Sequence, residues 1–285
     1  MDALRVEGLS KHYPGFELQD VTFTLPAGSI MGFIGENGAG KTTTLKACLG
    51  LIHPDGGRVD ILGQPFSDNE RDCKEQLGVV FDECCFHDNL ALRDINRIMG
   101  GIYRSWDPAL FQAYTRQLDL PEGKIVKQFS KGMKMKLNIA VALGHRPRLL
   151  ILDEPTSGLD PVMREELLDL FQEFIQDDQH SILLSSHITS DLDKIADYIT
   201  FIHEGRLLFS QPKDELLDTM GLLKCGAADF EAMDPKEVLR YRKSQFGYEV
   251  LLPDRRRYLA RHPGSLVDPA TVEEIMLFYV RGERK

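Results

Sequence analysis

The chain has 285 residues, of which 42% are hydrophobic and 27% charged, as expected for a globular protein with a sizeable core. Its formal net charge of −10 argues against a nucleic-acid binder that works through a broad basic face. The sequence has no apolar run of about 18 residues and no signal-peptide hydrophobic region, so any membrane crossing would require another chain. The cysteines include no C-x-x-C pair, which favours reduced thiols over a disulfide or zinc framework: Cys48, Cys73, Cys84, Cys85 and Cys225.

The first 81 residues combine short strands and turns with one helix. Apolar and polar residues alternate in the two earliest segments, which predicts an antiparallel β-layer. The later strands are short apolar runs of buried type. In chain order we expect strands at 4–9, 17–25, 29–34, 58–63 and 77–81, with a helix over 44–51.

Residues 89–145 change to a helical pattern, which predicts an inserted helical subdomain. Strands and helices then alternate, and this alternation implies a mostly parallel sheet covered on both faces. The expected elements are helices 92–102, 108–118 and 134–143, strand 149–152, helix 161–176, strand 181–185, helix 189–196 and a hairpin over 198–209. From these changes in pattern we expect a main domain over 1–217 and a small accessory region of strands and helices over 218–285.

The most informative motif lies between the strand at 29–34 and the following helix. It matches the phosphate-loop pattern G-x-x-x-x-G-K-[ST], in which glycines let successive backbone N–H groups point at phosphate oxygens. Lys41 is expected to reach the β- and γ-phosphates, and Thr42 to offer its hydroxyl to Mg²⁺. The motif predicts nucleoside triphosphate binding by Gly35, Glu36, Asn37, Gly38, Ala39, Gly40, Lys41, Thr42 and Thr43.

A second phosphate-site element follows the strand at 149–152, which ends in Asp153 and Glu154. Both carboxylates are expected at the carboxyl end of a buried strand, beside the phosphate loop. Asp153 is then placed to hold the Mg²⁺ shell. Glu154 is placed to polarise a water molecule for in-line attack on the γ-phosphate.

A third element, residues 129–133, opens the helix expected from Lys134. Ser130 is expected to be a helix N-cap, and Gly132 allows close approach of the backbone, so the helix start can face an anion. A plain N-cap is the alternative. The position of Ser130, 23 residues before Asp153 (153 − 130), favours the anion site.

Residues 1–217 resemble the nucleotide-binding subunit of ATP-binding cassette (ABC) transporters. The resemblance is carried by the phosphate loop, the element at 129–133, the acidic strand end at 153–154, the turn at 157–160 and His187, which occur in the family's order. The resemblance implies an α/β P-loop NTPase of ABC-cassette type, with a mixed RecA-like sheet core, an antiparallel β-layer and the inserted helical subdomain. It also implies ATP and Mg²⁺ as cofactors. The C-terminal region would be a small α+β appendage.

In the family, two subunits sandwich two ATP molecules head to tail. Carried over, Ser130 and Gly132 would contact the γ-phosphate held by the other subunit, and Asp160 would cross the dimer seam. Glu154 would be the general base, and His187 would hydrogen-bond the γ-phosphate and the attacking water.

The resemblance also assigns a role to a residue near the start of the chain. Tyr13 matches the aromatic residue that stacks on adenine.

Two departures from the family pattern stand out. Asp82 replaces a Gln that bridges Mg²⁺ and the membrane subunit; as a hard oxygen ligand it can keep the metal role. Lys131 replaces a Gly and Met133 a Gln in the signature at 129–133. Lys131 either adds charge toward a phosphate or is simply solvated.

The resemblance implies a second copy of this chain and a separate integral-membrane permease as partners, at the cytoplasmic face of the membrane, with no nucleic acid. Phe86, Tyr103 and Trp106 either line a groove for the permease or pack inside the helical subdomain. The signature, Asp82 and the stretch at 273–279 look most like bacterial ATPases of two-gene exporters for peptides, toxins or drugs. The alternatives are a soluble ABC ATPase acting on ribosomes or DNA and a non-hydrolysing regulatory module.

Overall fold

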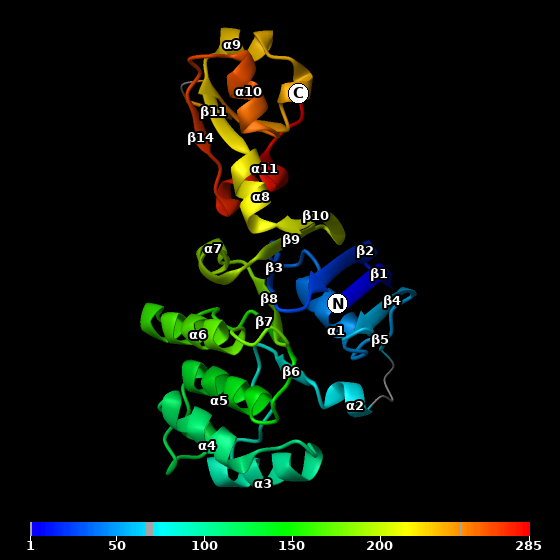
Figure 1. Cartoon of the computed structure of the whole chain (residues 1–285), viewed down its shortest axis with the longest axis vertical. Helices are drawn as coiled ribbons and strands as arrows, with labels where there is room; N and C mark the ends of the chain where they lie inside the picture. Colours follow the sequence, from blue (N-terminus) through cyan, green and yellow to red (C-terminus); the bar gives the residue numbers. More distant parts are fainter. Residues whose placement is uncertain (1, 67–70, 246) are drawn as a thin grey trace. The chain divides into compact units, whose positions relative to one another are not determined.

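The computed structural model describes residues 2–66, 71–245 and 247–285 (Figure 1). It divides into two compact units, Met1–Ser210 and Gln211–Lys285. The sequence interpretation placed the boundary after residue 217, a position that lies inside helix α8 (Lys213–Thr219). Each unit is described separately below.

The first unit is built on a large mixed sheet with the strand order β5-β4-β1-β2-β10-β9-β3-β8-β7-β6. The pairs β6–β7, β7–β8, β8–β3 and β3–β9 are parallel, whereas β1 pairs antiparallel with β2 and β4. Both the expected parallel core and the expected antiparallel layer are confirmed. The strands are β1 Asp2–Tyr13, β2 Phe16–Pro26, β3 Ile30–Ile34, β4 Gly56–Ile61, β5 Gln64–Pro65, β6 Leu77–Val80, β7 Leu149–Asp153, β8 Ser181–Ser186, β9 Tyr198–His203 and β10 Arg206–Pro212.

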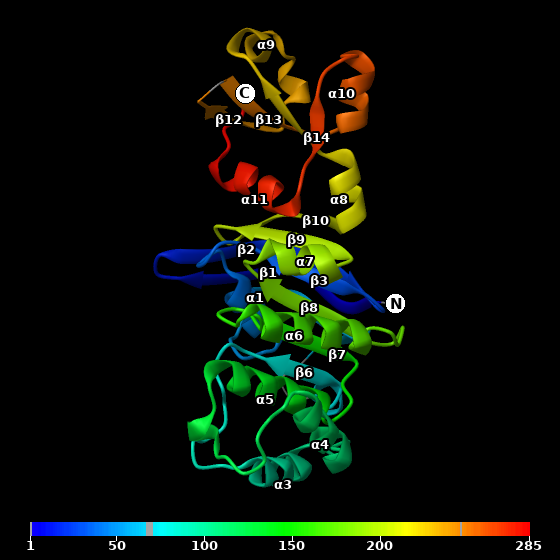
Figure 2. The same ribbon diagram turned by 90° about the vertical axis from the view of Figure 1, so that its left-hand side faces the viewer.

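Helices cover both faces of the parallel strands, as the sequence predicts. Figures 1 and 2 show α6 and α7 on one face and α1 on the other, while α3, α4 and α5 gather next to β6. The helices are α1 Lys41–Cys48, α2 Arg71–Lys74, α3 Leu92–Ile102, α4 Pro108–Gln117, α5 Lys131–Leu143, α6 Pro161–Phe174 and α7 Thr189–Ile195.

Two helices begin earlier than expected. Helix α1 starts at Lys41 rather than Thr44, because the Thr44 N–H already donates to the Gly40 carbonyl at 2.8 Å. Helix α5 starts at Lys131 rather than Lys134, because Ser130 caps it by accepting a hydrogen bond from the Met133 N–H. The predicted N-cap role of Ser130 is therefore confirmed.

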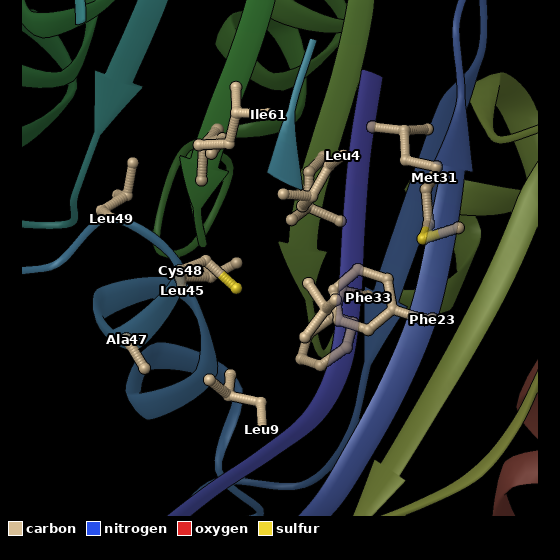
Figure 3. Close-up of a cluster of buried hydrophobic side chains, with 14 of the residues drawn as sticks. Leu4, Leu9, Phe23, Met31, Phe33, Leu45, Ala47, Cys48, Leu49 and Ile61 are labelled. Carbon is tan, nitrogen blue, oxygen red and sulfur yellow. The ribbon is translucent and has the colours of Figure 1, made fainter. Parts of the chain in front are cut away.

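The core beneath the phosphate loop fixes where α1 lies. Leu45 and Cys48 of α1 are fully buried among side chains of the first strands (Figure 3). Phe23 and Phe33 pack there with ring centroids 5.4 Å apart. Full burial of one leucine stabilises the fold by roughly 1.5–3 kcal/mol, so this packing holds the start of α1 at the carboxyl end of β3.

The helical subdomain has its own small core. The Trp106 indole N–H donates to the Asn96 side chain at 2.7 Å, and its ring packs against Phe111. Tyr103 stacks on His145 with ring centroids 4.0 Å apart. Of the two readings left open for Tyr103 and Trp106, packing inside the subdomain is confirmed.

The second unit has a four-stranded antiparallel sheet in the order β12-β13-β11-β14. Its core includes Phe230, whose ring stacks on Tyr248 at 4.0 Å. The elements after α8 are β11 Gly221–Cys225, α9 Ala227–Ala232, a 3₁₀ helix Pro235–Glu237, β12 Arg240–Ser244, β13 Gly247–Leu252, α10 Arg255–Arg261, β14 Val267–Pro269 and α11 Val272–Arg281. In the part of the chain that the structure describes, no helix is both long and apolar enough to cross a membrane.

Candidate functional site

The phosphate loop joins the carboxyl end of β3 to the start of α1, and two of its glycines are structurally required. At Gly35 a Cβ would lie 2.5 Å from the Ile202 carbonyl oxygen. Gly40 has φ +113°, in the left-handed region, and a Cβ there would meet the Phe16 ring at 3.0 Å. Larger side chains would therefore push the loop away from the sheet.

Lys41 is almost fully buried, with 6% of its side chain exposed. Its ammonium group donates to the carbonyls of Gly35 at 2.8 Å and Glu36 at 3.3 Å, and lies 3.2 Å from Glu154 Oε1. A buried ammonium is costly unless it is paired and hydrogen-bonded. The loop thus holds one positive charge at the point where α1 begins.

The Asp153 carboxylate, at the end of β7, accepts a hydrogen bond on each oxygen. The Thr42 hydroxyl donates to Oδ2 at 2.8 Å, and the Ser185 hydroxyl donates to Oδ1 at 2.5 Å. Thr42 and Asp153 are therefore adjacent, as the sequence predicts. Ser185 was not among the predicted site residues; it reaches Asp153 because the two residues lie opposite each other in the β7–β8 register.

Glu154 follows directly in a left-handed conformation, with φ +52°. Its backbone N–H donates to the Ser185 carbonyl and to the Ser185 hydroxyl, each at 3.1 Å. Its Oε2 lies 2.7 Å from His187 Nδ1. The two predicted catalytic side chains, Glu154 and His187, are thus in contact, with Lys41 on the other carboxylate oxygen.

The phosphate loop and Glu154 border a cavity of about 510 Å³, within the range of nucleotide-sized ligand sites. Seven of the nine predicted loop residues line it; of the other two, Gly35 accepts from Lys41 and Ala39 is buried. The lining comprises Gly15, Phe16, Glu36, Asn37, Gly38, Gly40, Lys41, Thr42, Thr43 and Glu154.

Gly15 and Phe16 line the cavity, although neither was predicted as a site residue. Phe16 lines it, one residue after the Pro14-Gly15 turn, and only its place next to a glycine turn could have signalled this. Tyr13 is not among the described lining residues. It is 37% exposed at the end of β1, with the Lys11 ammonium 5.5 Å from its ring centroid.

The residues predicted to act on the partner's ATP or at the dimer seam are not among the described residues that line this cavity: Ser130, Gly132 and Asp160. Ser130 caps α5, and a Cβ on Gly132 would meet Met163 Sδ at 2.6 Å. Asp160 caps α6, accepting from the N–H groups of Val162 and Met163. Each has a local structural role in one chain.

The two departures from the family pattern contact each other. Lys131 Nζ lies 2.9 Å from Asp82 Oδ1, and about half of each side chain is exposed. Lys131 is therefore partly solvated, as one of the two alternatives expected, and its charge is paired with Asp82 within its own subunit. The pair joins the loop after β6 to the first turn of α5.

A second cavity of about 530 Å³ adjoins the first, because Thr42 lines both. Asp82 and Asp153 line this second cavity as well. Phe86 lines it too, with Cys84 and Cys85. For Phe86, unlike Tyr103 and Trp106, the groove reading is supported.

Comparison with known proteins agrees with this geometry. A family model described as ABC transporter matches residues 18–157. The bacitracin transport ATP-binding protein BcrA of Bacillus licheniformis is 37% identical over 222 residues, which cover 75% of this chain and 71% of BcrA. The lantibiotic transport ATP-binding protein SrtF of Streptococcus pyogenes is 35% identical, covering 74% of this chain and 91% of SrtF. The ABC transporter ATP-binding protein YtrB of Bacillus subtilis is 29% identical over 99% of both chains.

Solved structures give the same result. The ATP-binding subunit of an ABC transporter superposes with a TM-score of 0.67 at 30% identity, covering 75% of this chain and 91% of that one. A dimeric ATP-binding cassette bound to ADP and phosphate has a TM-score of 0.66 at 19% identity, covering 73% and 98%, which supports the fold alone. The chain belongs to the ABC transporter family as an ATP-binding ATPase subunit.

Proposed function

We propose that this ABC transporter ATPase dimerises around two ATP molecules and powers a separate membrane permease that exports peptides, toxins or drugs. The observation that carries the proposal is the position of Glu154. Its carboxylate is held between Lys41 of the phosphate loop, at 3.2 Å, and His187, at 2.7 Å. A base in that position faces the place where a terminal phosphate would lie.

The residues of the chain divide the work. The loop N–H groups and Lys41 bind the phosphates, so the Lys41–Glu154 contact gives way to a Lys41–phosphate contact when ATP enters. Glu154 is then free to accept a proton from the attacking water. His187 orients the Glu154 carboxylate through its Nδ1. Tyr13 is proposed to stack on the adenine.

The residues beside the loop fit Mg²⁺, which prefers hard oxygen ligands and keeps several waters. Thr42 and Asp153 present a hydroxyl and a carboxylate 2.8 Å apart, and Asp82 lies near them along the second cavity. When bound, the ion would neutralise charge on the β- and γ-phosphates. Thr42 and Asp153 are proposed to hold it, and Asp82 joins them once its pair with Lys131 opens.

The proposed dimer is supported by residues that do not line the cavity within one copy. Ser130, Gly132 and Asp160 are outside the described cavity lining, and a second copy could supply them to the site. A cassette with the same fold has been solved as a dimer. We therefore propose a head-to-tail dimer in which Ser130 and Gly132 reach the γ-phosphate bound by the partner and Asp160 lines the seam.

Cargo and partner are inferred from relatives and from the second cavity. BcrA and SrtF are named for bacitracin and lantibiotic transport, which supports export of antimicrobial peptides at the cytoplasmic face of the membrane. Phe86 and its neighbours offer an open groove beside the metal-site residues. That groove suits a segment of a permease, whose docking would then sense the nucleotide.

Substituting Glu154→Gln tests the assignment of the base. The amide cannot accept the proton, so steady-state ATP hydrolysis should fall by about 10²-fold or more. ATP should still bind, and should convert the 32.3 kDa chain into a stable dimer in size-exclusion chromatography with light scattering.

Ser181→Ala is the matched control, because Ser181 lies on β8 at the end opposite the site and should leave the rate unchanged. Hydrolysis within a few-fold of wild type in the Glu154→Gln variant would remove Glu154 as the base. A variant that binds ATP but stays monomeric would overturn the dimer.

A further inference from the structure

A serine on β8 contacts both acidic residues at the end of β7. Ser185 is fully buried, and it lies opposite Asp153 in the parallel β7–β8 pairing and opposite Phe33 in the β3–β8 pairing. It therefore stands between the strand that leads into the phosphate loop and the strand that ends in the two carboxylates. A buried strand would ordinarily place an apolar side chain there.

The hydroxyl of Ser185 makes two different hydrogen bonds. It donates to Asp153 Oδ1 at 2.5 Å, the length of a charge-assisted O–H···O⁻ bond. It also accepts from the Glu154 N–H at 3.1 Å. One atom thus fixes the rotation of the Asp153 carboxylate and the backbone of Glu154.

Each of these contacts has a consequence for the site. Asp153 is 5% exposed, and with Oδ1 engaged by Ser185 its other oxygen, Oδ2, points at the Thr42 hydroxyl. Glu154 has φ +52°, a conformation that non-glycine residues keep only when surrounding contacts enforce it. Here the enforcing contacts are the Ser185 carbonyl and hydroxyl.

From this geometry we infer that Ser185 is a positioning residue, which aims the Asp153 carboxylate at the Thr42 metal position and sets the direction of Glu154. The inference rests on the proposed function of those two residues. It gives Ser185 no contact with substrate, so it acts only through Asp153 and Glu154. Its neighbour Ser186 differs, because its hydroxyl bonds to Ile188 at the start of α7.

The test compares Ser185→Ala with Ser181→Ala. Both serines are fully buried on β8, but Ser181 accepts from the Gly28 N–H at the opposite end of the strand. A fluorescent, non-hydrolysable ATP analogue is titrated into each full-length protein in EDTA and again with Mn²⁺. The dissociation constant in EDTA divided by that with Mn²⁺ measures how much the metal strengthens binding, and it does so without relying on activity.

For Ser185→Ala we expect that ratio to fall about 10-fold, as for other outer-shell partners of metal ligands, and kcat to fall by a similar factor. Metal-free binding of the analogue should stay within two-fold of wild type. Ser181→Ala should change neither quantity.

Three results would overturn the inference. The first is a Ser185→Ala protein with the wild-type ratio and kcat. The second is a loss of metal-free binding as large as the loss with Mn²⁺, which a general structural role would produce. The third concerns a substitute variant, Ser185→Cys, to be used if Ser185→Ala does not fold. Its thiol is a weak donor, so a wild-type ratio in Ser185→Cys would contradict the inference.

The proposed function fails in a distinguishable way. Wild-type protein that neither gains affinity from Mn²⁺ nor hydrolyses ATP would contradict the assignment of Asp153 and Glu154 themselves. Wild-type protein that does both, together with an unaffected Ser185→Ala, would contradict only the role of Ser185.

Discussion

At the scale of single residues, charges in and around the site are matched by specific partners. Lys41 is buried among two carbonyl oxygens and Glu154, so its contacts already resemble those that phosphate oxygens would make. Asp82 and Lys131 neutralise each other at 2.9 Å, although about half of each side chain is exposed. The extra negative charge that Asp82 brings to this loop is thus balanced inside the subunit.

A double-mutant cycle on Asp82→Asn and Lys131→Met should give a coupling free energy of about 0.2–1 kcal/mol in urea unfolding, because exposed pairs are screened by water. The coupling should shrink in 1 M salt, where the screening length is about 3 Å. Lys134 and Asp88, whose charged groups lie 3.7 Å apart, provide a control cycle with a smaller coupling. A salt-independent coupling would show that the contact is not mainly electrostatic.

At the scale of elements, the residue at the end of α5 ties the helical subdomain to the sheet. His145 follows that helix and is 1% exposed. Its Nε2 lies 2.9 Å from the Leu77 carbonyl at the start of β6, and Tyr103 stacks on its ring. Burial disfavours the charged imidazolium and lowers the pKa of His145 below its ordinary value of 6.5.

This lowered pKa makes stability depend on pH. Below about pH 6.5 the unfolded chain binds a proton at His145 that the folded chain does not. The free energy of unfolding should therefore decrease as the pH is lowered. Urea unfolding at pH 7.5 and 5.5 should show a smaller loss for His145→Gln than for wild type. The difference should be at most about 1.4 kcal/mol per pH unit.

The exposed His53 gives the control for that comparison, since His53→Gln should keep the wild-type pH dependence. Equal losses for wild type and His145→Gln would mean that His145 does not carry the effect.

At the scale of the whole molecule, ATP hydrolysis can power transport only if the resulting conformational change of this chain is transmitted to another protein. The cavity lined by Asp82 and Phe86 is open on one side. The separate permease proposed above would dock there.

Affinity purification of the tagged chain from detergent-solubilised cells of its source should recover an integral-membrane protein. Phe86→Asp should reduce that recovery at least several-fold, because a charge would replace an apolar contact in the groove. The ATPase rate of the isolated variant should stay near wild type. Recovery of ribosomes or DNA with no membrane protein would favour the alternative of a soluble ABC ATPase.

The sequence by itself determined the features that are local. The phosphate loop and the acidic end of β7 are contiguous motifs, and the strand-then-helix context of each placed Lys41, Thr42, Asp153 and Glu154 at one edge of a parallel sheet. Ser130 was identified as an N-cap for the same reason, because a cap bonds within its own first turn.

Only the tertiary structure decided the contacts that depend on strand order and register. Ser185 reaches Asp153 because β8 lies beside β7 in a register that pairs these two residues. Lys131 meets Asp82 because α5 packs next to β6. Residues far apart in the chain meet only after the sheet is assembled, and a one-residue shift in register would turn Ser185 to the other face.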